Sequence, residues 1–86
     1  MRRLDFTIES NWLYVGDDAI RLDLIKKLRV ENSCLDNTKY AIHLHTDNMV
    51  LELYYTSPDK TLIQDACDEL LLAIIEAKKE NENTIG

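Results

Sequence analysis

The stretch 40-YAIHLHTDNMVLELYYT-56 decides the fold of this chain, because two alternating runs, 40–46 and 49–56, flank a short polar turn. Asp47 and Asn48 tolerate a positive φ and suit a two-residue loop, so the runs predict a β-hairpin. The register of this hairpin places three pairs on one face of the sheet, namely Leu44 with Leu51, Ile42 with Leu53 and Tyr40 with Tyr55. The other face carries the pairs His45 with Val50, His43 with Glu52 and Ala41 with Tyr54. The first face is predicted to be core, because a one-residue slip would expose all of it.

Shorter strands are expected upstream of this hairpin. Period-two alternation predicts strands over 4–8 and 12–15, with turn residues between and after them. We interpret 19–31 as a strand over 19–22, a helical turn over 23–27 and a strand over 28–31. A single amphipathic helix over 19–29, begun by Asp18, is the alternative for the same residues. A polar loop over 32–39 leads into the hairpin.

A helix is predicted to follow the hairpin. Ser57 suits the N-cap, Pro58 the first helical position, and Asp59 the N-terminal end of the helix dipole. A wide apolar stripe follows, made of Leu62, Ile63, Ala66, Cys67, Leu70, Leu71 and Ile74. The pattern stops after Ala77, and residues 81–86 are expected to fray.

These elements predict an α+β fold. We expect an antiparallel sheet of about five strands, a β-meander, with one C-terminal helix packed across one face. Residues 1–80 form a single α+β domain in this interpretation, and residues 81–86 form a frayed C-terminal tail. A chain of 86 residues with 45% hydrophobic content is long enough for one core and too short for two.

The charge balance bears on the class of partner. Ten basic against sixteen acidic residues give a net charge of −6, which argues against direct nucleic-acid binding, since that affinity comes largely from neutralising phosphates. The longest uncharged apolar run is six residues, too short to span a membrane. Two cysteines, Cys34 and Cys67, are too few for a secreted disulfide framework, so we expect a cytoplasmic protein.

Motifs for catalysis are missing from the sequence. With Gly16 and Gly86 the only glycines, neither a glycine-rich phosphate loop nor a nucleophile elbow can be built. We therefore expect a protein that is not an enzyme and that uses no cofactor. A metal site is an alternative function, because His43, His45 and Glu52 share a predicted sheet face and could bind a divalent metal such as zinc.

Two surfaces are candidates for binding a partner. If Leu13 and Val15 point inward, the outer sheet face carries the residues Trp12, Tyr14, His43, His45 and Tyr54. On the predicted helix, Leu72 and Ile75 stand clear of the apolar stripe. An antiparallel pair of such helices would set Leu72 against Ile75 of a second copy, and also Asp68 against Lys79 and Glu69 against Lys78.

The sequence therefore predicts a small, acidic protein–protein interaction protein that forms a homodimer. Accessory, adaptor or inhibitor proteins of phages and mobile elements include many chains of this size without site chemistry. The alternative is an acidic decoy that mimics nucleic acid and occupies a basic protein groove, using the helix carboxylates Asp65, Asp68, Glu69, Glu76 and Glu80.

Overall fold

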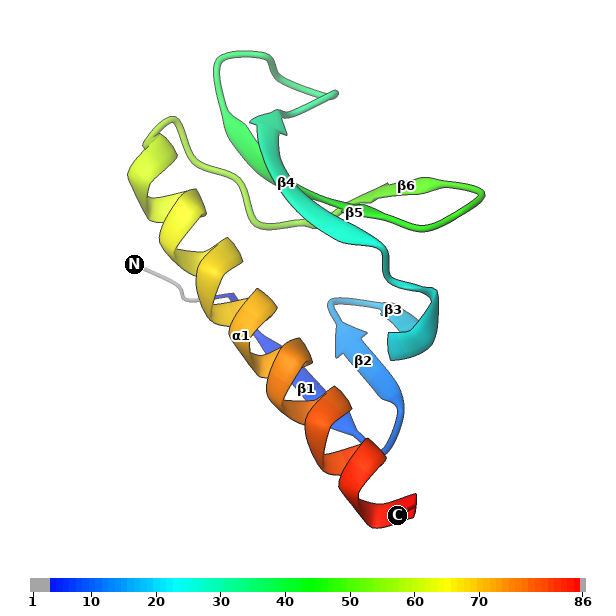
Figure 1. The fold of residues 1–86 in the computed structure, drawn as a ribbon. Helices are drawn as coiled ribbons and strands as arrows, with labels where there is room; N and C mark the ends of the chain where they lie inside the picture. The colour runs from blue at the N-terminus through cyan, green and yellow to red at the C-terminus, as the bar shows by residue number, and fades with distance from the viewer. Residues whose placement is uncertain (1–3, 86) are drawn as a thin grey trace.

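Six strands and one long helix form the described part of the protein, in an α+β arrangement (Figure 1). The computed structural model describes residues 4–85, with the side chains of residues 4–80. The first antiparallel sheet contains β1 (Phe6–Glu9), β2 (Trp12–Val15) and β3 (Asp18–Arg21), and the second contains β4 (Lys27–Asn32), β5 (Tyr40–His45) and β6 (Val50–Glu52). A 3₁₀ turn, η1 (Leu22–Leu24), joins the sheets, and α1 (Lys60–Ile85) follows the second.

The prediction of one five-stranded meander is corrected, because the strands divide into two three-stranded sheets at η1. Leu22 and Ile25 are buried here, and the amide of Leu22 donates to the carbonyl of Asn11 at 2.7 Å. The next contact, from the amide of Lys26 to the carbonyl of His45 at 2.7 Å, already belongs to the second sheet. The strand–turn–strand interpretation of residues 19–31 is confirmed, and the single helix over 19–29 is wrong.

Both hairpins of the first sheet have two-residue loops. Glu9 pairs with Trp12 and Val15 with Asp18, so each loop consists of the two residues between the paired positions. The first loop residue has a positive φ in both cases, 54° at Ser10 and 58° at Gly16. Two-residue hairpin loops favour this backbone region because its twist matches that of the strands.

Gly16→Ala is expected to lower the free energy of unfolding by about 1–2 kcal/mol, the cost of placing a Cβ in the left-handed region. A Cβ at this position would meet no atom within 4 Å, so the cost is backbone strain and not a clash. Urea denaturation measures it. Gly16→Asn should lose less stability, because asparagine tolerates a positive φ better than alanine. Equal losses in both variants would contradict the role of the backbone angle.

The β5–β6 hairpin confirms the predicted register next to the turn. His43 pairs with Glu52, Leu44 with Leu51 and His45 with Val50. The chemistry of the turn differs from the prediction, since neither Asp47 nor Asn48 has a positive φ. The Thr46 hydroxyl instead accepts hydrogen bonds from the amides of Asn48 and Met49, at 3.3 and 3.1 Å. A threonine side chain thus stabilises the loop.

Beyond Leu53 the predicted register is wrong. The amide of Leu53 still donates to the carbonyl of Ile42 at 3.0 Å, but Tyr40 then pairs with Ser57 and not with Tyr55. Residues 54–56 therefore lie opposite the single residue Ala41, and the predicted pair of Ala41 with Tyr54 is lost. Such a bulge bends the strand and redirects its side chains. Tyr54 accordingly turns out to solvent, with 82% of its surface exposed.

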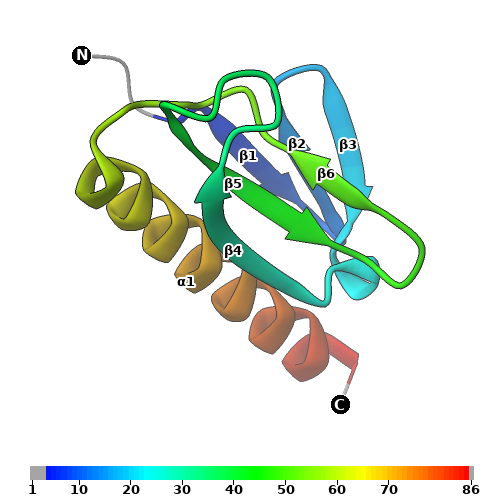
Figure 2. The same cartoon turned by 90° about the horizontal axis from the view of Figure 1, so that it is seen from above.

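One hydrophobic core unites the two sheets and α1. The helix contacts β4 and β5 of the second sheet and β1 of the first, and it runs along one side of both (Figures 1 and 2). Most of the buried apolar residues form a single cluster, namely Leu13, Val15, Leu22, Ile25, Ile42, Leu44, Leu53, Ile63, Ala66, Cys67, Leu70 and Ile74. Each sheet therefore buries one face against the other elements and leaves the opposite face outward.

The helix begins two residues later than the sequence predicts. Asp59 is the N-cap, because its Oδ1 accepts hydrogen bonds from the amides of Thr61 and Leu62, at 3.0 and 3.4 Å. The hydroxyl of Ser57, predicted as the cap, accepts from the amide of Asp59 at 3.1 Å instead. The helix runs through Ile85, beyond the end of the apolar stripe. The fraying of residues 81–86 stays a prediction.

Candidate functional site

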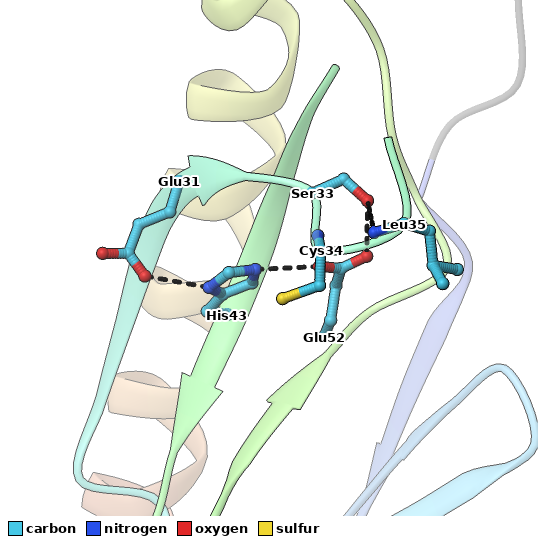
Figure 3. Close-up of polar contacts among 6 residues, drawn as sticks. All are labelled: Glu31, Ser33, Cys34, Leu35, His43 and Glu52. Atoms are coloured by element: carbon cyan, nitrogen blue, oxygen red, sulfur yellow. Dashed lines mark hydrogen bonds and ion pairs between the residues drawn. The ribbon is translucent and has the colours of Figure 1, made fainter. Parts of the chain in front are cut away.

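His43 lies at the centre of a polar cluster on the outward face of the second sheet (Figure 3). It belongs to β5, the middle strand, so residues of both β4 and β6 flank it. Its Nδ1 lies 2.9 Å from Oε2 of Glu31, and its Nε2 lies 3.0 Å from Oε1 of Glu52. Only 6% of the residue is exposed. A buried imidazole is thus held between two carboxylates.

The loop after β4 folds over toward β6 and completes the cluster. The hydroxyl of the buried Ser33 donates to Oε2 of Glu52, and the amide of Cys34 donates to Oε1, both at 2.8 Å. The Ser33 hydroxyl also accepts from the amide of Leu35 at 3.2 Å. Glu52 therefore contacts His43, Ser33 and Cys34, and its hydrogen bonds hold the loop after β4 against the sheet.

Hydrogen bonding decides the ionisation of the two carboxylates. Desolvation opposes the charge on Glu52, yet the hydrogen bonds from Cys34, Ser33 and His43 outweigh it and lower the pKa of Glu52 below its ordinary value. The hydrogen bond from His43 likewise lowers the pKa of Glu31. Both carboxylates are therefore charged at neutral pH.

Cys34 brings a thiol to the same place. Its Sγ, a ring nitrogen of His43 and a carboxylate oxygen of Glu52 all lie within 4.8 Å of one another. Partial desolvation and the neighbouring Glu52 carboxylate raise the pKa of the Cys34 thiol. The arrangement collects sulfur, nitrogen and oxygen ligands at one point on the surface, where the cysteine is exposed.

The sequence predicts His43 and Glu52 as ligands together with His45, but the structure brings Cys34 to them instead. His45 lies on the same face of β5, opposite Lys27 and Val50. Its Nε2 is buried and has no hydrogen-bond partner among the described residues. Periodicity could not have found Cys34, because it lies in an irregular loop, and residue alternation carries no information on where such a loop returns.

One side of α1 exposes three large aliphatic side chains. The exposed fractions are 41% for Leu71, 58% for Leu72 and 42% for Ile75, and we call these three residues the apolar flank. Exposure of Leu72 and Ile75 was predicted. Leu71 was predicted to belong to the apolar stripe that faces the core, and its exposure shows that this prediction is wrong. It lies about 100° around the helix from the fully buried Leu70, past the side that the sheets cover.

Several charged residues of α1 lie close to the apolar flank. Asp68 and Lys79 lie on the same side of the helix as Leu72 and Ile75, and Asp68 accepts a hydrogen bond from Nε2 of Gln64 at 3.0 Å. The exposed side chains of four acidic residues continue around the helix from Leu72, and we call Asp65, Glu69, Glu76 and Glu80 the acidic flank. Glu76 and Glu80 also line, with Phe6 and Ile8, a groove of about 300 Å³.

The predicted pairing of Glu69 with Lys78 of a second copy is corrected. Nine helical positions separate the two residues, so they point to opposite sides of α1. Two antiparallel helices related by a two-fold axis bring the same sides together, so Glu69 does not face Lys78 of the second copy. Asp68 and Lys79 share the side of Leu72, and their predicted pairing remains geometrically possible.

The aromatic residues do not form the single face that the sequence predicts. Trp12 and Tyr14 are exposed on β2 of the first sheet, whereas His43 and His45 lie on the second sheet. Tyr14 and Tyr54 do come together, because both line a groove of about 760 Å³ beside the start of β1. The division of the strands into two sheets separates the other members of the predicted set.

Among residues 4–85, no helix has the length and apolar character needed to cross a membrane. Comparisons of the chain with protein-family models, with curated proteins and with solved structures gave no match.

Proposed function

We propose that this chain is a non-enzymatic protein–protein interaction protein that works as a homodimer, joined through the apolar flank of α1. The observation that carries the proposal is the exposure of Leu71, Leu72 and Ile75 side by side on one helix. Single exposed leucines are ordinary on protein surfaces, but a contiguous apolar surface is typical of an interaction site.

The flank suits a second copy of the chain because it is self-complementary. In an antiparallel pair of helices, Leu72 lies against Ile75 of the second copy, and Asp68 lies against Lys79. Exposed ion pairs contribute only about 0.2–1 kcal/mol each, so the dimer would depend on apolar burial, while the ion pairs would fix direction and register.

The cysteines support a reducing compartment for this function. Cys34 is exposed and Cys67 is buried, and both are free thiols. Free exposed thiols persist where glutathione and thioredoxin keep them reduced, as in the cytoplasm. We therefore place the dimer in the cytoplasm, as an accessory, adaptor or inhibitor protein.

Leu72→Asp tests the proposal. A charge in the apolar interface, added to an acidic helix, is expected to convert a particle of about twice the 10.0 kDa chain mass into a monomer. Light scattering at high micromolar concentration measures the mass, and circular dichroism reports whether the fold is kept. Leu24→Asp is the matched control, because Leu24 is 51% exposed but lies in η1, and this variant should remain a dimer.

Three other outcomes would overturn the assignment. A monomeric wild type would exclude the homodimer. Equal dissociation of Leu72→Asp and Leu24→Asp would show that the apolar flank is not the interface. Dissociation by Glu69→Lys, with Leu72→Asp still dimeric, would move the interface to the acidic flank.

A further inference from the structure

We infer that Cys34, His43 and Glu52 form a binding site for a zinc ion, with Glu31 as the residue that orients His43. The three ligand groups lie within 4.8 Å of one another. Around a tetrahedral zinc, with bonds of about 2.0–2.3 Å, ligand atoms lie about 3.3–3.7 Å apart, so only small side-chain movements would bring these groups to the ion. The site does not depend on the dimer.

The ligand types select the metal. A thiolate, an imidazole and a carboxylate together suit zinc, whereas calcium and magnesium take oxygen ligands. Cys34 loses its proton to solvent on binding, and His43 binds through Nε2 in the form in which that nitrogen carries no proton. Three protein ligands leave a fourth position, which a water molecule or a group of a partner protein can fill on this exposed surface.

The surroundings of the ligands resemble those of known zinc sites. Nδ1 of His43 faces Glu31 at 2.9 Å, which directs Nε2 toward Glu52 and Cys34 (Figure 3). Histidines that bind zinc commonly donate their other ring N–H to a carboxylate in this way. Ser33 orients the second ligand, since its hydroxyl donates to the Glu52 oxygen that His43 does not contact. Two of the three ligands are thus held in place by hydrogen bonds from outside the ligand set.

The loop between β4 and β5 gives such a site a structural consequence. The loop already depends on Glu52, which accepts from the Cys34 amide at 2.8 Å. A zinc ion would add a bond from the Cys34 thiolate to groups on β5 and β6. Zinc would therefore stabilise the loop, and the surface that the loop presents would depend on the metal.

Zinc titration of the full-length chain, kept reduced and first freed of metal with a chelator, tests the site. The wild type should bind one zinc ion per chain by calorimetry and should melt at a higher temperature with zinc. Cobalt should give a thiolate-to-metal charge-transfer band. Cys34→Ala removes an exposed ligand, so this variant should keep its fold. The heat of zinc binding and the cobalt charge-transfer band should both disappear.

Three further variants locate the site. Cys67→Ala and His45→Ala should bind zinc as the wild type does, since neither side chain belongs to the ligand set. Glu31→Gln should weaken zinc binding about 10–100-fold without abolishing the thiolate band, the effect expected of a residue that positions a ligand. An unchanged melting temperature and no heat with the wild type at excess zinc would overturn the proposal. So would zinc binding by Cys34→Ala at wild-type affinity, or loss of binding in His45→Ala.

Discussion

Leu70→Ala is expected to lower the free energy of unfolding by about 3–5 kcal/mol. Leu70 is fully buried and belongs to the cluster in which α1 meets both sheets. Removing its side chain loses apolar burial and leaves a cavity that rigid strands on two sides cannot fill. For a domain of this size the loss is a large part of the total stability.

Leu71→Ala provides the matched control one residue along the helix. Because Leu71 is 41% exposed, the same truncation should cost about 1 kcal/mol or less. Urea denaturation of both variants, carried out in the Leu72→Asp background so that dimerisation does not contribute, measures the difference. Similar losses at the two positions would show that Leu71 belongs to the core, as the sequence alone predicts.

Glu52→Ala is expected to destabilise the metal-free protein by about 2–3 kcal/mol. The substitution removes the acceptor for Ser33, Cys34 and His43 together, and two of these three residues are buried. Hydrogen exchange at the Cys34 amide should accelerate, because its partner is gone. Glu31→Ala should cost less, since Glu31 has a half-exposed side chain and contacts only His43 within the cluster.

Acid should reduce the difference in stability between the wild type and Glu52→Ala. The pKa of Glu52 is lowered in the folded protein, so its contribution is fully present above the ordinary glutamate value of 4.5 and is lost as the pH falls through the lower folded value. Denaturation curves over this acid range measure the effect. A difference that stayed constant through the acid range would show that the charge of Glu52 does not stabilise the fold.

The sequence predicted the parts of the fold that depend on local alternation. The pairs of His43 with Glu52 and of Leu44 with Leu51 followed from a two-residue loop and a strict period of two. Residues 54–56 broke the register because they must carry the chain from β6 to the helix while Tyr40 pairs with Ser57. That requirement is set by the position of α1, which no local pattern encodes.

Other differences between the predicted and the observed structure arise where two local conformations have similar free energies. Ser57 and Asp59 are both good helix caps, and the tertiary contact of Ser57 with Tyr40 favours the later start. Cys34 shows the limit for the candidate site. His43 and Glu52 were found because a strand register brought them together, whereas the thiol reaches them through the conformation of an irregular loop.

The strand order has a consequence for how fast the chain folds. Every strand pair in the described part of the protein joins neighbours in sequence, and three of the four pairs are closed by short loops, of two residues in the first sheet and of four residues, 46–49, between β5 and β6. Closing short loops costs little chain entropy, and hairpins of this kind form within about 1–10 μs. The slow step is then the docking of α1 against β1 and β4, which brings distant parts of the sequence together. We therefore expect single-exponential folding, with the core side of α1 formed last and with a rate set by Leu70 and Ile74 more than by the turns.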